Sequence, residues 1–185
     1  MKILKFLYLI VIVTFVVSCS SDDDTVIPFV TAPQNNVTVG ESVFEMKSAI
    51  ISSSIGDNTY IQLTNKTETE LLANMNDGTN LYNVDFMVIR LNQDPLGETT
   101  YTFSDMLDYD FMIDGDVIYG EYEDGITLLA ENHSDTNLEA VSGSVTITYY
   151  AVDRIDLTFE FERNDGTIIT GSYSGSFIDE VDSDN

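Results

Sequence analysis

Three runs near the end of the chain alternate apolar and polar residues with a period of two. They span residues 141–149, 155–162 and 169–177, and Asn164-Asp165-Gly166 is a turn signal between the last two. Successive side chains of a strand point to opposite faces of a sheet, so this period predicts strands with one buried and one wet face. Short turns between such strands predict an antiparallel meander.

Shorter runs rich in β-branched and aromatic residues precede this meander. Only one or two helical turns are expected, after Thr67-Glu68-Thr69-Glu70, which has the spacing of a capping box and is followed by a stop signal at Asp77-Gly78. The sequence therefore predicts an all-β domain over residues 37–178, an antiparallel β-sandwich or flattened barrel of about 8–10 strands. A closed barrel would also offer a lipocalin-like pocket. The shorter runs lie at residues 43–46, 60–63, 81–91, 99–103, 107–113, 117–122 and 125–131.

The first part of the chain, residues 1–18, has the features of a secretory signal peptide. Lys2 and Lys5 precede an apolar run at residues 6–17, which is too short to cross a hydrocarbon core that needs about 20 helical residues. The single cysteine, Cys19, follows directly after a small serine, and residues 16–19 resemble a bacterial lipobox. That resemblance implies that Cys19 carries acyl chains such as palmitate, and two or more such chains anchor a protein stably to a membrane.

The residues after the cysteine suggest where the anchor faces. Residues 20–24, Ser-Ser-Asp-Asp-Asp, resemble the surface-export signals of Bacteroidetes lipoproteins, which implies an outer-membrane anchor and a domain facing the cell exterior. A solvated acidic linker is the alternative. We expect residues 19–36 to be a lipidated, flexible acidic tether and residues 179–185 to be an acidic disordered tail. Thr25 lies in a tripeptide that resembles the O-glycosylation site of these bacteria.

The β-rich part of the chain resembles a family of small uncharacterised Bacteroidetes lipoproteins that are exported to the surface. The resemblance rests on a tyrosine-bearing strand at residues 99–103, the Gly-Ser-Val-Thr-Ile-Thr run at 143–148 and a glycine-rich strand at 171–177. It covers most of residues 44–177. The chain departs from the family at residues 156–159, Asp-Leu-Thr-Phe, where the family often has Gly-Thr-Phe. The resemblance implies a fold and a location, and it carries no activity.

The charge of the chain excludes one class of partner. The sequence holds 32 Asp and Glu against 7 Lys and Arg, and its formal net charge is −25. Nucleic acid is therefore not a natural partner, because phosphate binding depends on Lys and Arg. The same charge disfavours flat contact with an anionic membrane. With Cys19 lipidated, no cysteine remains for a disulfide, a thiolate nucleophile or a zinc site.

One acidic segment raises the question of a cation. Between residues 91 and 153 the chain has fourteen Asp and Glu and no Lys or Arg. If Asp114-Gly115 is a two-residue hairpin loop, Asp108 lies opposite Glu121 on the outward face. Opposed like charges cost up to about 1 kcal/mol, and a hard cation would remove this cost. One hypothesis is a weak Ca²⁺ site formed by Asp108, Asp110 and Glu121; the alternative is a solvated acidic face.

The sequence contains no convincing catalytic motif. The glycine-flanked run 171–175 lacks the central serine of a nucleophile elbow, so its glycines are expected to permit a bend or a close backbone approach. His133 is the only histidine and lies in a polar loop without an evident partner. Glu160 and Glu162 share a face that is expected to be wet, whereas a glycosidase acid needs an apolar pocket.

The expected function is therefore a non-enzymatic binding or structural β-domain of a surface lipoprotein, with a protein, a glycan or a small molecule as the partner. One alternative is a calcium-dependent adhesion or glycan-binding module, which a calcium titration would separate from the first. The other is a small hydrolase that uses acidic residues, which alanine substitutions at Asp108, Asp110 and Glu121 would test.

Overall fold

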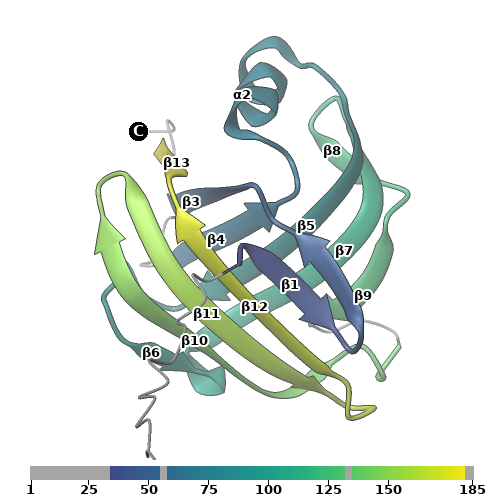
Figure 1. Cartoon of the computed structure of the whole chain (residues 1–185), viewed down its shortest axis with the longest axis vertical. Coiled ribbons are helices and arrows are strands. Elements are labelled where there is room, and N and C mark those ends of the chain that lie inside the picture. Colours follow the sequence, from purple (N-terminus) through teal and green to yellow (C-terminus); the bar gives the residue numbers. More distant parts are fainter. Residues whose placement is uncertain (1–33, 55–57, 132–134, 182–185) are drawn as a thin grey trace, which may run out of the picture. The chain divides into compact units, whose positions relative to one another are not determined.

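The computed structural model describes residues 34–54, 58–131 and 135–181 (Figure 1). Thirteen strands in these residues form two sheets that pack against each other, together with one α-helix and one short 3₁₀ helix, η1, at Phe103–Asp105. The predicted all-β fold is confirmed, and the sandwich has more strands than the sequence predicted. The described part holds no helix that is long and apolar enough to span a membrane.

The first sheet contains the predicted meander. Its six strands run in the order β2-β1-β12-β11-β10-β6, and every pair is antiparallel. Bulges near both ends of β10 turn Val141 and Tyr149 out to solvent, although strict alternation placed both on the buried face. The strands are β1 (Asn36–Val39), β2 (Ser42–Glu45), β6 (Thr100–Thr102), β10 (Ala140–Ala151), β11 (Arg154–Arg163) and β12 (Ile168–Gly175).

The second sheet has the order β13-β3-β4-β5-β7-β8, and β9 also pairs with β7. One pair, β13 with β3, is parallel, and the others are antiparallel. The chain passes from the first sheet to the second three times, between β2 and β3, between β6 and β7, and between β12 and β13. The strands are β3 (Ser48–Ser54), β4 (Asn58–Thr64), β5 (Leu81–Leu91), β7 (Met106–Ile118), β8 (Glu121–Glu123), β9 (Ile126–Ala130) and β13 (Phe177–Val181).

Side chains fill the space between the sheets. A single cluster of 23 buried residues occupies it, with Phe111 and Phe161 among the largest side chains that are fully buried. Gly171 lies across from Phe159, and a Cβ atom there would come within 2.1 Å of the Phe159 ring. The predicted close approach at this glycine is therefore confirmed. Because side chains fill the space between the sheets, a ligand-binding site is expected on the outer face of a sheet.

Helix α2 (Glu68–Asp77) begins at the predicted capping box. The backbone N–H of Thr67 donates to Glu70 Oε2 at 2.8 Å, and the Glu70 N–H donates to Thr67 Oγ1 at 3.4 Å. These bonds satisfy amides that the first turn of a helix leaves free. The helix ends as predicted at Gly78, whose φ of 66° is left-handed. It is longer than the predicted one or two turns because Leu71 is buried against the second sheet.

The predicted hairpin at Asp114-Gly115 is wrong. β7 continues through both residues, and the chain turns at Tyr119 and Gly120, whose φ angles of 52° and 86° suit a tight hairpin. Gly115 serves a different purpose: a Cβ atom there would lie 2.1 Å from the Tyr122 ring. Gly115, which the sequence analysis assigned to a turn, instead provides room for the Tyr122 ring.

Three strands escaped prediction. β1, β3 and β13 are brief or rich in serine, and β13 extends to Val181, three residues into the segment predicted as a tail. Several predictions fall outside the described residues: the signal peptide, the tether up to residue 33, Cys19, Thr25 and His133.

Candidate functional site

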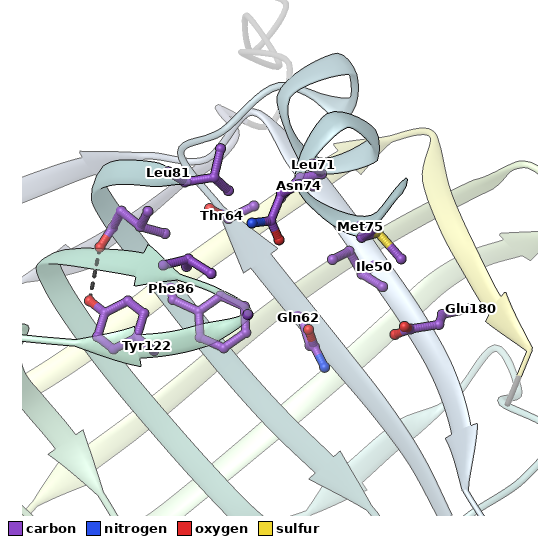
Figure 2. Close-up of a pocket in the computed structure, with 13 residues that line it drawn as sticks. Ile50, Gln62, Thr64, Leu71, Asn74, Met75, Leu81, Phe86, Tyr122 and Glu180 are labelled. Carbon is purple, nitrogen blue, oxygen red and sulfur yellow. Dashed lines mark hydrogen bonds between the residues drawn. The ribbon is translucent and has the colours of Figure 1, made fainter. Parts of the chain in front are cut away.

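Helix α2 lies over the outward face of the second sheet and encloses a pocket of about 290 Å³ (Figure 2). The roof comes from the helix and the floor comes from strands of the sheet. In Figure 2, Tyr122 stands at one end of the pocket and Glu180 at the other. The lining residues are Ile50, Gln62, Thr64, Leu71, Asn74, Met75, Leu81, Val84, Phe86, Val117, Gly120, Tyr122 and Glu180.

The floor of the pocket follows from the register of the strands. Ile50 on β3 pairs with Gln62 on β4, and Thr64 pairs with Phe86 on β5. Their neighbours along the strands point into the core between the sheets, so these side chains point outward. Ile50 and Phe86 belong to a second apolar cluster, which also contains the buried residues Leu71, Leu81 and Val84. The outward face beneath the helix is therefore mostly apolar, with Gln62 and Thr64 as its polar members.

Tyr122 forms the wall at one end of the pocket. Its ring lies close over Gly115 and Gly125, and it stacks on Phe86 with a centroid distance of 6.2 Å. Its hydroxyl donates to the carbonyl oxygen of Val84 at 2.9 Å. Burial raises the pKa of Tyr122 to about 12, so the phenol is neutral at physiological pH. This wall is uncharged, and a hydrogen bond and two close glycines hold its ring in place.

The polar groups of the pocket are few. Gln62, Thr64 and Asn74 contribute amide and hydroxyl groups, and Asn74 Nδ2 donates to the carbonyl oxygen of Thr79 at 2.7 Å. Glu180 is the only charged residue in the lining. The ion pairs among the described residues are Arg154–Asp156 and Arg163–Asp165, so Glu180 has no cationic partner there.

The apolar surface continues from the pocket to solvent. Met75 lines the pocket and is 43% exposed, and Leu72 beside it on the helix is 39% exposed without lining the pocket. Tyr119, at the tip of the β7–β8 hairpin, is 88% exposed and precedes Gly120 of the lining. The mouth thus has apolar edges.

The lining of the pocket is mostly apolar, with few polar groups. It contains no histidine, cysteine, serine, lysine or arginine, and Glu180 is its single carboxylate. The arrangement suits an apolar ligand that is oriented by amides and one carboxylate.

The structure does not bring the three predicted calcium ligands together. Asp108 lies opposite Arg90 and Asp110 lies opposite Val88, both on β7, whereas Glu121 on β8 lies opposite Ile118. Ten residues of β7 separate Asp108 from Ile118, about 30 Å along a strand. Within the described ranges, no group of three or more Asp, Glu, His or Cys is arranged to hold a metal ion. The opposed carboxylates that motivated the hypothesis do not occur.

The other residues considered for catalysis lie on the outward face of the first sheet. Glu160 and Glu162 are exposed on β11, as predicted, and Glu162 accepts a hydrogen bond from Ser142. Ser172 Oγ donates to the carbonyl oxygen of Gln34, and Ser174 Oγ donates to Asp156. These serines hold strands and side chains in place, and the carboxylate that Ser174 contacts, Asp156, forms an ion pair with Arg154.

Sequence reasoning missed the pocket, although one signal pointed to it. In residues 81–91 the outward positions 86 and 88 are Phe and Val, so both faces of β5 are apolar. A strand that is apolar on both faces is covered on both faces. The sequence does not show which element covers this face. In the fold, α2 lies between β4 and β5 in the chain and places Leu71 against Leu81 and Val84 of β5.

The pocket is thus defined by an apolar floor, a helical roof, an aromatic wall and one carboxylate at its mouth. The chain was compared with protein-family models, with curated proteins and with solved structures, and no match was found.

Proposed function

We propose that this protein is a lipid-anchored outer-membrane lipoprotein, facing the cell exterior, whose β-domain binds a small and mostly apolar ligand without catalysing a reaction. The observation that carries the proposal is the pocket beneath α2, with apolar side chains on its floor and roof and a few polar groups at fixed positions. Small-molecule sites usually have this composition.

The energetics of the pocket are sufficient for binding. Removing apolar surface from water contributes roughly 25 cal/mol per Å², so a ligand that buries about 100 Å² of apolar surface gains roughly 2.5 kcal/mol before entropic costs. The aromatic wall is already fixed by the hydrogen bond from Tyr122 to Val84. A preformed wall lowers the cost of ordering the site on binding.

The proposed location rests on the sequence of the first 24 residues, with Cys19 as the anchor. Mass spectrometry of the protein from its native membrane tests it, and we expect an amino-terminal Cys19 that carries fatty acyl groups. A Cys19→Ser variant should then be lost from the membrane fraction. An unmodified thiol with the leader still attached would contradict the proposed anchor.

The absence of tryptophan from the sequence makes a direct binding test possible. We suggest the chain from residue 19 with Cys19→Ser, so that no acyl chain competes for the pocket, carrying Met75→Trp as its only tryptophan. Octanol should shift the tryptophan emission saturably. The matched control is Leu72→Trp, on the same helix and about equally exposed but outside the lining. Equal responses from both variants, or none from Met75→Trp, would contradict the proposed binding function.

A further inference from the structure

We infer that the ligand of this pocket is a small amphiphile with one positive charge, whose apolar body lies beneath α2 and whose ammonium group meets Glu180. The inference rests on the proposed function, because it names the ligand class of the same pocket. It starts from the charges that line the pocket.

The pocket contains one charge and that charge is negative. Glu180 is the only ionisable carboxylate in the lining, no lysine or arginine lines the pocket, and no ion pair with Glu180 occurs among the described residues. The whole chain carries a formal charge of −25. Glu180 and the negative charge of the whole chain both attract a cationic head group, and both repel an anionic one.

The position of Glu180 suits a head group that remains hydrated. On β13, Ile178 pairs with Ile50 and Glu180 pairs with Ser52, so the carboxylate lies one outward position beyond the apolar floor. Glu180 is exposed, whereas Ile50 is buried. Figure 2 shows the side chains of Ile50 and Met75 between the helix backbone and Glu180. An amine at this place avoids the cost of burying a charge, while its apolar body is removed from water.

An anionic amphiphile is the obvious competitor, and one arginine lies on the same face of the sheet. Arg90 stacks over the Tyr60 ring, with 5.2 Å from its guanidinium carbon to the ring centroid, and it lies opposite Asp108. It does not line the pocket. A carboxylate in the pocket would therefore face Glu180 rather than Arg90.

Three ligands that share one alkyl chain separate the contribution of the head group. Octylamine, octanol and octanoate are titrated at neutral pH into the Met75→Trp chain described above. We expect octylamine to bind roughly two- to fivefold more tightly than octanol, as for an exposed ion pair, and octanoate to bind more weakly than octanol. Added salt should reduce the advantage of octylamine and leave octanol unchanged.

Two single-charge variants identify the carboxylate responsible. Glu180→Gln should remove most of the advantage of octylamine over octanol, each measured on the same variant. Asp179→Asn removes the same charge from the neighbouring residue, which does not line the pocket, and should have little effect. Octylamine that binds no better than octanol, or equal losses in the two variants, would overturn the inference and leave the proposed function standing. Failure of all three ligands to bind would overturn both.

Discussion

Tyr122 owes its position to two residues that lack a side chain. A Cβ atom on Gly115 would lie 2.1 Å from the Tyr122 ring, and a Cβ atom on Gly125 would lie 2.4 Å from it. Gly115 has no positive φ, so its backbone would accept alanine and only the ring forbids one. The end wall of the pocket thus depends on steric room at two glycines.

This contact predicts a strong coupling between Gly115 and Tyr122. Gly115→Ala should lower the free energy of unfolding by about 1–3 kcal/mol, the usual cost of overpacking. In a Tyr122→Ala background the same change should be nearly neutral, because the ring that forbids the methyl group is gone. Urea unfolding of the four proteins measures the coupling. A Gly115→Ala cost that is the same in both backgrounds would contradict this account of the wall.

Tyr122 also makes stability depend on alkaline pH. Its pKa is about 12 in the folded protein and about 10 in an unfolded chain. Between these values the unfolded state binds fewer protons, so the stability contributed by the neutral phenol is present below about pH 10 and is lost as pH rises toward 12. Unfolding measured from about pH 9 to 12 should show a shallower decline for Tyr122→Phe than for the wild type. The other tyrosines titrate in both proteins, so parallel curves would count against the burial of this hydroxyl.

At the scale of elements, helix α2 links stability to binding because it is the roof of the pocket. Thr67→Ala removes the capping hydroxyl and should cost about 1 kcal/mol of unfolding free energy, and the loosened first turn should weaken octanol binding. Thr69→Ala is the control, since Thr69 is exposed in the same first turn and alanine has the higher helix propensity. Chemical unfolding of both variants is the measurement. An equal loss of unfolding free energy in the Thr69→Ala and Thr67→Ala variants would contradict a stabilising role for the Thr67 cap.

The elements that could be predicted are those whose sequence signals lie within or directly next to them. The bounds of β5 match the predicted run 81–91, β11 follows from strict alternation, and the capping box at Thr67 marks the start of α2. The turn at Asp114-Gly115 was mispredicted because glycine serves both turns and close contacts, and only the fold reveals the ring of Tyr122 above it. The pocket was missed because its lining comes together only in the folded sheet, where α2 covers β4 and β5 and residues of β3, β7, β8 and β13 complete the site.

At the scale of the whole molecule, the two sheets present different outer faces. β11 on the first sheet exposes Thr158, Glu160 and Glu162 to water, whereas the outward face of the second sheet is apolar beneath α2. Only a covered face can keep apolar side chains from water. The two outer faces therefore differ: that of the first sheet is solvated at β11, and that of the second sheet carries the pocket.

The large negative charge predicts that salt stabilises the fold. Self-repulsion among the carboxylates is screened as ionic strength rises, with a Debye length of about 10 Å at 0.1 M. Calcium chloride and sodium chloride at equal ionic strength should therefore raise the melting temperature by similar amounts. The calcium hypothesis predicts a larger shift with calcium, one that Asp108→Asn and Asp110→Asn remove. Thermal melts with a chelator as the baseline decide between the two.

The central claim is that the ligand lies between α2 and the outward face of the second sheet. Methyl NMR spectra recorded during an octanol titration test it most directly. The account predicts saturable shifts in the methyl groups of Ile50, Leu71 and Met75, which line the pocket, and unchanged signals from Ile51 and Ile89, which lie between the sheets. Shifts concentrated at Ile51 and Ile89, or no saturable shift at the pocket methyls, would contradict it.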